Sequence, residues 1–597
     1  MISPWYYRYA PWWLTALVFF LLVPGTSTLP LIDRDEPRFA TATREMIQRH
    51  DWIVPTFNGH DRFDKPVLTY WLMRFGYSVF GFTEFGARVH AILATLALVL
   101  LTWWVGRRWY GDAVGLWAGA MLASCLQIFI HGRLALADMP MIACVTLSCV
   151  ALKELLEPAF TSAPASSTPP GAGGDVAAVQ AMHTPSAVAA QAAKPFFRNG
   201  WWWAFYLSLG FGFLAKGPIV FAVPGLALLL FRFVLWRRHP LPWRNLAILP
   251  GLGLTLLIMA SWGIPALVVT EGRFWKVGMG EHVVQRGWDR FNGRGYSPFF
   301  YLGTAPVSLF PWIAAIGFLP WIARRTWSAQ TAWLICWLVA PYLIFTAYAT
   351  QLPHYVLPAF PALFLLLAQA ITLPRTEWPR GARRLAWSVL AIFFVIVVVA
   401  LIAVRIAILP ENIEPLRSPM TGVFLVLIGF VLFATALLRR WPLLGVVAAC
   451  VLLPGIIAMA KGLRRTSLTA ESDGWPQRIV GDARCVGAGF SEPSVVFYSG
   501  RQWLFPQNEA ELEAVIAAPG PLVVASVLEE ADPLKFFVNG VAERFGIKRV
   551  TKFSPGSADV ARVLSMRTTQ AGWESHEVEG FNLGRTRWQR LRIAVRR

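Results

Sequence analysis

The stretch from Leu31 to Tyr70 reads LIDRDEPRFATATREMIQRHDWIVPTFNGHDRFDKPVLTY, and it decides the fold because it places many charges between long apolar runs. A charged side chain at the centre of a bilayer costs about 3 kcal/mol. The stretch is therefore predicted to lie at a membrane face, between membrane-spanning helices. Asp35 and Glu36, followed by Pro37, indicate the N-terminus of a helix within it.

Two interpretations of this stretch are open from the residues alone. It could be a solvated loop with helix caps, since Lys65 before Pro66 also marks the start of a helix. Caps alone, however, require neither Asp64 nor Lys65. Clustered charges with perturbed environments are typical of functional sites, so we favour a functional role.

The composition indicates a membrane protein. The 597 residues are 56% hydrophobic and 15% charged, which is not typical of a soluble enzyme. Many apolar runs reach the roughly 18 residues that a spanning helix needs. The net charge of +20 could suggest nucleic acid, but the basic residues stand in pairs between apolar runs and no nucleic-acid motif is present. The six cysteines form neither a disulfide framework nor a CxxC metal pattern.

The apolar runs predict about thirteen transmembrane helices within residues 1–460. Helices at about 36–49 and 66–80 are expected to lie along the interface as juxtamembrane helices. Residues 158–195, rich in Pro, Ala, Ser and Gly, are expected to form a disordered loop. The positive-inside rule places this loop and five arginine pairs on the cytoplasmic side. The pairs are Arg107-Arg108, Arg237-Arg238, Arg324-Arg325, Arg383-Arg384 and Arg439-Arg440.

The tail, residues 461–597, changes character and is predicted to be a small α/β domain on the periplasmic side. Ser494–Tyr498 and Pro521–Val527 are β-prone, and Glu509–Ala518 favours a helix. Its arginine-rich end is either a solvated basic terminus or a contact for anionic lipid headgroups. The sequence leaves both open.

The same topology gathers the unusual polar segments on one non-cytoplasmic face: residues 31–83, 131–138, Lys216, 271–298, 351–355 and the tail. The chain contains no Walker loop, no HExxH and no GxSxG. Lysines and arginines beside carboxylates suit phosphate binding with a positioned acid or base. Two classes of function therefore remain open: group transfer on a lipid-bound substrate, and transport of such a substrate.

Nine short motifs resemble those of one family. They are DEPRFA (Asp35–Ala40), REM (Arg44–Met46), DWIVP (Asp51–Pro55), FDKP (Phe63–Pro66), FGAR (Phe85–Arg88), LAD (Leu136–Asp138), AKGP (Ala215–Pro218), EH (Glu281-His282) and LPHYVLP (Leu352–Pro358). Together they resemble the lipid A aminoarabinose transferases and their relatives over most of residues 12–375. Many relatives carry Glu where this chain has Asp64.

The resemblance implies a polytopic all-α membrane protein of the GT-C type, carrying the small C-terminal domain. It implies transfer of a sugar, aminoarabinose or a related one, from an undecaprenyl-phosphate donor to a lipid A phosphate or a similar periplasmic acceptor. The enzyme would lie in the bacterial inner membrane with its site facing the periplasm, and would confer polymyxin resistance. No cofactor is implied, and a divalent metal is not expected. A protein O-glycosyltransferase and a lipid-linked sugar transporter are the alternatives.

The resemblance also implies the site residues. Asp35 and Asp138 match the family's acidic catalytic positions. The phosphate-binding and substrate-binding positions match Arg38, Asp64, Lys65, Arg88, Lys216, Glu281, His282, His354 and Tyr355. Lys65, Arg88 and Lys216 would neutralise the leaving phosphate, while Asp35 would orient or deprotonate the acceptor. The basic loop 271–298 suits an anionic acceptor. The sugar, the acceptor, the oligomeric state and the role of the C-terminal domain stay open.

Overall fold

The computed structural model describes residues 7–157 except 33, 196–236, 241–278, 280 and 297–389. It also describes 467–532 except 471–473 and 480, and 572–597 except 583, 584 and 586, with a few isolated residues between these ranges. The predicted loop 158–195, the site candidates Glu281 and His282, and most of the spans expected between 383 and 461 lie outside the described residues.

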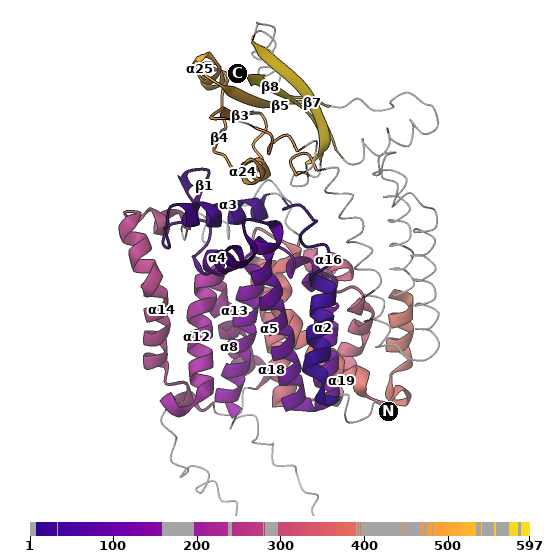
Figure 1. The fold of residues 1–597 in the computed structure, drawn as a ribbon. Helices are drawn as coiled ribbons and strands as arrows, with labels where there is room; N and C mark the ends of the chain where they lie inside the picture. The colour runs from indigo at the N-terminus through magenta and orange to yellow at the C-terminus, as the bar shows by residue number, and fades with distance from the viewer. Residues whose placement is uncertain are drawn as a thin grey trace, which may run out of the picture.

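A bundle of helices forms the larger part of the described chain (Figure 1). Its first half contains α2 (Ala10–Leu22), α5 (Glu84–Tyr110), α6 (Asp112–Ala123), α7 (Leu126–His131), α8 (Asp138–Leu155), α12 (Gly200–Lys216), α13 (Ile219–Leu230) and the π-helical η2 (Phe231–Leu235). The second half contains η3 (Trp243–Leu246), α14 (Ile248–Val269), α16 (Phe300–Ser308), η6 (Trp312–Phe318), α17 (Leu319–Arg325), α18 (Ala329–Ala347), η7 (Pro353–Ala359) and α19 (Phe360–Thr372). Apolar side chains from these helices form one continuous core.

Four helical segments among the described residues are long and apolar enough to cross a membrane: Glu84–Tyr110, Trp243–Val269, Ala329–Ala347 and Pro353–Thr372. Ala10–Leu22, Asp112–Ala123 and Ile219–Leu235 are apolar but shorter. The apolar run at residues 113–130 is not one continuous helix. It is broken between α6 and α7, where Leu126 N–H donates to the carbonyl of Phe310 (2.8 Å). The count of thirteen spans therefore stays a prediction.

Two short helices cover one end of the bundle, as predicted: α3 (Asp35–Gln48) and α4 (Leu68–Phe80). A small hairpin, β1 (Thr56–Phe57) with β2 (His60–Asp61), connects them. Their buried faces share a core that includes Phe39 and Tyr70, whose rings lie 5.2 Å apart. Helices α3 and α4, with the hairpin between them, thus form a platform across the end of the bundle (Figure 1).

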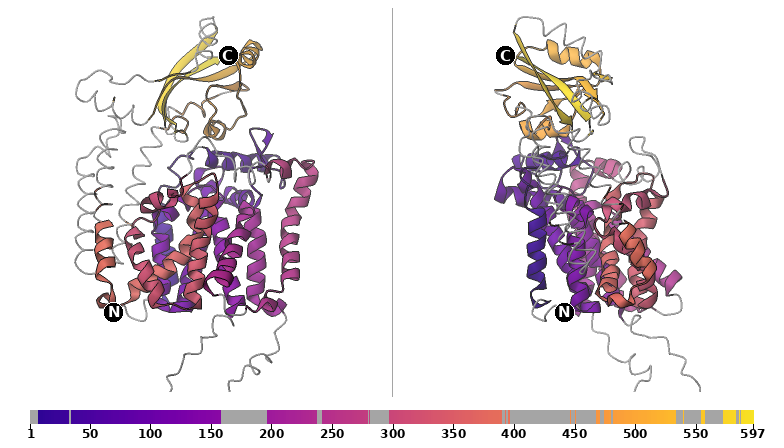
Figure 2. Two further views of the ribbon diagram at one scale, coloured as in Figure 1. Left: turned by 180° about the vertical axis from the view of Figure 1, so that it is seen from behind. Right: turned by 90° about the vertical axis from the view of Figure 1, so that its right-hand side faces the viewer.

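The C-terminal domain is a small α/β unit, as predicted. Its strands are β3 (Arg484–Ala488), β4 (Trp503–Leu504), β5 (Leu522–Ala531), β6 (Ser554–Pro555), β7 (Trp573–Asn582) and β8 (Arg587–Arg596). The main path of the sheet runs β4-β3-β5-β8-β7. Strand β3 is parallel to β4 and β5, and β8 is antiparallel to β5 and β7. In both views of Figure 2 this orange and yellow domain stands at the end of the bundle that the platform covers.

Two details of the tail differ from, or refine, the sequence prediction. Helix α25 (Glu509–Ala517) and strand β5 lie where predicted, but the β-prone Ser494–Tyr498 lies within helix α24 (Pro493–Ser499). Pro493 begins this helix. Val495 and Val496 are buried in the core of the domain, and this burial outweighs their β propensity. The basic terminus forms β8 and ends at Arg597, the residue after this strand. Four of its arginines pair with glutamates: Arg587, Arg590, Arg592 and Arg597. These pairs favour the solvated basic terminus over a headgroup contact.

Candidate active site

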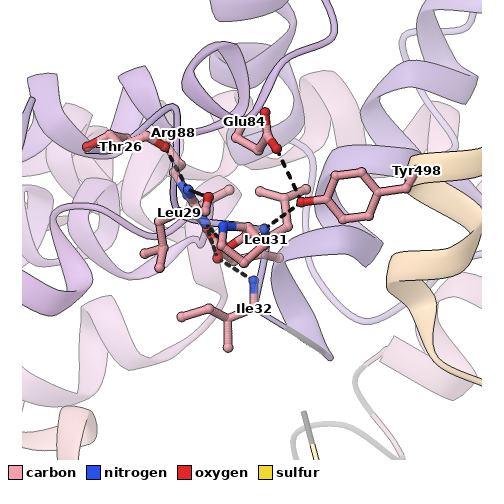
Figure 3. Close-up of polar contacts among 10 residues, drawn as sticks. Thr26, Leu29, Leu31, Ile32, Glu84, Arg88 and Tyr498 are labelled. Carbon is pink, nitrogen blue, oxygen red and sulfur yellow. Dashed lines mark hydrogen bonds and ion pairs between the residues drawn. The ribbon is translucent and has the colours of Figure 1, made fainter. Parts of the chain in front are cut away.

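Arg88 anchors the platform to the bundle (Figure 3). Its side chain is 0% exposed, and it donates to Glu36 from Nε (2.8 Å) and Nη2 (2.7 Å). Its remaining N–H groups donate to the carbonyls of Thr26 (2.8 Å), Leu29 (2.6 Å) and Pro30 (2.8 Å). A guanidinium has five N–H donors, so Arg88 has none left for a phosphate. The side chain of Arg88 is fully used in holding the fold, which argues against the expectation that Arg88 binds the leaving phosphate.

Glu36, which was not among the predicted site residues, completes this anchor. Besides Arg88, its carboxylate accepts from the backbone N–H of Ile32 (2.8 Å) and of Ala135 (2.7 Å). The carboxylate therefore joins the start of α3 to the segment before Asp138. Its position between Asp35 and Pro37, in the most densely charged motif, was the one signal in the sequence that could have marked Glu36 as a candidate.

Asp138 and Lys216 form an ion pair at the platform end of the bundle, with Nζ and Oδ1 2.5 Å apart. Asp138 begins α8 and Lys216 ends α12, where Gly217 terminates the helix with a positive φ of 90°. An anion at a helix N-terminus and a cation at a C-terminus both interact favourably with the helix dipoles. The Ala-Lys-Gly-Pro motif thus builds a helix end that presents its lysine to Asp138.

Two histidines and a tyrosine surround this pair. His354 Nε2 lies 3.8 Å from Asp138 Oδ1, and the rings of His131 and His354 are 4.7 Å apart. Lys216 Nζ lies 5.5 Å from the centre of the Tyr355 ring. We call Asp138, Lys216, His131, His354 and Tyr355 the Asp138 cluster. Four of its members were predicted as site residues, and His131 was missed although it lies in a polar segment already placed on this face.

A second group, the Arg38 cluster, lies on the platform and consists of Asp35, Arg38, Arg62, Asp64 and Lys65. Arg62 is buried, pairs with Asp64 (3.0 Å) and donates to the hydroxyl of Tyr70 (3.1 Å). Lys65 Nζ donates to the carbonyl of Asp64 (3.0 Å). Asp35, the first residue of α3, is exposed. Arg62 was named in the charged stretch but not selected, although it stands two residues before Asp64.

The two arginines of this cluster differ in how well neighbouring groups offset the cost of burying their positive charge. Burial lowers the pKa of Arg62, but nearby Tyr70 and Asp64 outweigh burial and raise it. The pKa of Arg38 is lowered by burial and then by the neighbouring Arg62, beyond what Asp35 and Asp64 restore. The surrounding protein therefore satisfies Arg62 and leaves Arg38 as a cation that an added anion would stabilise.

Packing brings the two clusters to the same end of the bundle. Thr69, at the start of α4, donates to the carbonyl of Ala215, directly before Lys216 (3.4 Å). Ala137, directly before Asp138, belongs to the same buried core as Phe39 and Tyr70. Polar segments that were predicted to share one face therefore lie together at this end of the bundle. Arg107 and Arg108 end the 27-residue α5, about 40 Å from its start beneath the platform.

The start of the basic loop 271–298 also reaches the platform. Arg273 Nη2 lies 3.3 Å from Asp61, and Phe274 packs edge-on against Phe63 and Trp262. Across the ranges that the structure describes, no three His, Cys, Asp or Glu side chains gather as a metal ion would require. The expectation of a metal-free site remains a prediction.

Comparison with known proteins agrees with the resemblance seen in the motifs. Residues 64–162 match a family model described as dolichyl-phosphate-mannose-protein mannosyltransferase. The chain is 28% identical over 372 residues to the undecaprenyl phosphate-alpha-4-amino-4-deoxy-L-arabinose arabinosyl transferase of Erwinia tasmaniensis, covering 61% of this chain and 59% of that protein. It is 29% identical over 367 residues to the protein of the same name from Pseudomonas aeruginosa, covering 60% and 58%. The chain thus aligns with less than two thirds of the length of these relatives.

The crystal structure of ArnT from Cupriavidus metallidurans bound to undecaprenyl phosphate superposes on this chain with a TM-score of 0.69. The sequence identity is 19%, and the match covers 99% of this chain and 98% of the other. This likeness establishes the fold, including the small C-terminal domain. The resemblance to aminoarabinose transferases that the motifs predicted is confirmed.

Proposed function

We propose that this chain is an integral-membrane glycosyltransferase that moves a sugar from an undecaprenyl-phosphate donor to a phosphate of lipid A or a similar periplasmic glycolipid. The observation that carries the proposal is the ion pair between the buried Asp138 and the half-buried Lys216, beside His354 and Tyr355 and at the same end of the bundle as the Arg38 cluster. Buried charges of this kind are costly and are typical of functional sites. The names of the similar proteins support this choice, as does the undecaprenyl phosphate, the carrier part of the donor, that is bound in the similar structure.

The reaction breaks one bond and forms another at the sugar C1 atom. An acceptor oxygen forms a bond to C1, the bond from C1 to the phosphate oxygen breaks, and its electron pair stays on undecaprenyl phosphate. Lys216, Arg38 and Lys65 would stabilise the charge that develops on this leaving group. Arg38 suits the role because its pKa is lowered by burial and by Arg62, so a phosphate beside it restores a favourable environment.

The geometry refines the role expected of Asp138. Its carboxylate lies 2.5 Å from Lys216 Nζ, so it fixes where the lysine stands rather than meeting the acceptor as a base. His354, 3.8 Å from the same carboxylate, and Tyr355 would line the sugar side of this pair. We therefore propose Asp138 as the residue that positions Lys216.

Asp35 is proposed to meet the acceptor, because it is the exposed carboxylate of the Arg38 cluster and the first residue of α3. The second pKa of a phosphate monoester is about 6, so a lipid A phosphate is largely ionised at neutral pH. Such an acceptor needs orientation and no strong base. A hydroxyl acceptor, as in a protein O-glycosyltransferase, would require Asp35 to accept a proton.

The charges at the two ends of the bundle suggest how it is oriented in the membrane. Arg107 and Arg108 lie at the end opposite the platform and the C-terminal domain. The positive-inside rule then places the arginine end in the cytoplasm, and the candidate site at the periplasmic side of the inner membrane.

Lipid A composition tests this function in the cell. A strain lacking the gene is expected to lose sugar-modified lipid A, wild-type protein to restore it, and Asp35→Asn to fail while inserting normally in the membrane. Mass spectrometry of lipid A and of periplasmic glycoproteins would measure both acceptors. Unchanged lipid A with lost protein glycans would replace the proposal by the protein O-glycosyltransferase. Full restoration by Asp35→Asn would remove Asp35 from the mechanism.

A further inference from the structure

Tyr498 of the C-terminal domain contacts the segment that leads into α3 (Figure 3). Its hydroxyl accepts a hydrogen bond from Leu31 N–H (3.0 Å) and donates to the carboxylate of Glu84 at the start of α5 (3.3 Å). Leu31 is 1% exposed, so this N–H lies in a place where an unpaired donor is costly. The hydroxyl of Tyr498 therefore joins the segment before Asp35 to the bundle, and a second side chain of the domain, Glu492, lies 4.0 Å from Arg34 of the same segment.

Residues 26–32 and 34–36, which we call the strap, are fixed at several points. Arg88 holds three of its carbonyls and Glu36 holds the N–H of Ile32. Those contacts come from the bundle and from the strap itself. The hydrogen bond to Leu31 N–H comes instead from a residue 467 positions away in the chain.

Further contacts dock the same face of the domain onto the platform. Arg44 of α3 donates to the carbonyls of Phe497 (2.9 Å) and Val496 (3.1 Å), next to Tyr498. Asn58 exchanges two hydrogen bonds with the backbone of Trp503 (2.6 and 2.7 Å). With these contacts in place, the hydroxyl of Tyr498 is held at the strap.

We infer that Tyr498 is a positioning residue for Asp35, and that the C-terminal domain is through it a working part of the active site. The inference deepens the proposed function and rests on it. Asp35 stands four residues after Leu31, at the first residue of α3, so a shift of the strap displaces its carboxylate. Displacing a reacting group by about 1 Å can cost on the order of 100-fold in rate.

The test is Tyr498→Phe, which removes the hydroxyl and keeps the ring. We expect kcat for sugar transfer to fall about tenfold or more, with KM for the undecaprenyl-phosphate sugar unchanged, because the donor-phosphate cations are untouched. Hydrogen exchange at the strap amides is expected to quicken, since Leu31 N–H loses its acceptor. A purely structural role would instead lower the amount of folded protein without changing kcat per folded molecule.

The matched control is Ser526→Ala, which removes a buried hydroxyl elsewhere in the domain. Ser526 lies in β5 and donates to the carbonyl of Arg592, not to the strap. It should leave kcat and strap exchange as in the wild type. Wild-type kcat or unchanged strap exchange in Tyr498→Phe would overturn the inference, as would an equal loss in Ser526→Ala. A wild-type protein that transfers no sugar would contradict the proposed function instead, and strap exchange would then still decide whether Tyr498 holds Leu31.

Discussion

Replacing Arg88 by methionine is expected to destabilise the protein by about 3–5 kcal/mol, because it leaves the buried carboxylate of Glu36 without its cation. Three carbonyls of the strap lose their donors in the same variant. The measurement is the thermal unfolding midpoint of the protein in detergent, followed by a fluorescence or scattering probe. A large fall is expected, together with a low yield of folded protein.

Two further variants separate the buried ion pair from a general effect of losing an arginine. Arg107→Met removes a side chain that is 52% exposed and paired with the equally exposed Asp112, so it should cost at most about 1 kcal/mol. The double variant Glu36→Leu with Arg88→Met should recover part of the loss, because no charge then stays buried alone. An Arg88→Met protein as stable as the wild type would show that Arg88 does not hold the platform.

Replacing Lys216 by methionine is expected to lower kcat/KM for sugar transfer by about 10–150-fold, the equivalent of one charge-assisted contact worth about 1.5–3 kcal/mol. The variant also leaves Asp138 as a buried carboxylate without its cation, so stability falls as well. Activity must therefore be expressed per folded molecule. The measurement is transfer from an undecaprenyl-phosphate sugar in detergent, normalised by the monodisperse fraction.

The chain offers a matched control in Lys153, a second buried lysine of the bundle. Lys153 lies near the far end of α8 from Asp138 and pairs with Glu154 and Glu157. Lys153→Met should destabilise the fold less, because Glu154 keeps Arg108 and Trp109 as donors, and it should leave transfer per folded molecule at the wild-type level. Equal activity losses in the two variants would show that the effect of Lys216 is on the fold alone.

Much of the candidate site could be predicted because membrane topology restricts where polar residues lie. Asp138, Lys216 and His354 are far apart in sequence, yet the alternation of apolar runs and arginine pairs places all three on one face. Helix ends then explain the ion pair, since Asp138 begins one helix and Lys216 ends another. The two platform helices could likewise be predicted, because Pro37 and Pro66 mark helix starts among charged residues.

The roles of individual charges could not be predicted, because they depend on burial and on backbone partners. Arg88 looks like a phosphate ligand from its motif, and only the three strap carbonyls around it show that its donors are used. Glu36 is likewise indistinguishable in sequence from Asp35, although one is buried and the other exposed. The contact between Tyr498 and Leu31 joins two domains, and the β-prone run that contains Tyr498 gave no indication of its helix.

The most direct test of the central claim is transfer by the purified wild-type protein from an undecaprenyl-phosphate aminoarabinose labelled in the sugar, with lipid A as acceptor and with or without EDTA. The account predicts that the label appears on lipid A, that one undecaprenyl phosphate is released for each sugar transferred, and that EDTA has little effect. A label that stays on the donor lipid, even if that lipid crosses the membrane, would contradict it and favour a transporter. Activity lost to EDTA and restored by magnesium or manganese would contradict the proposal that lysines and arginines alone neutralise the leaving phosphate.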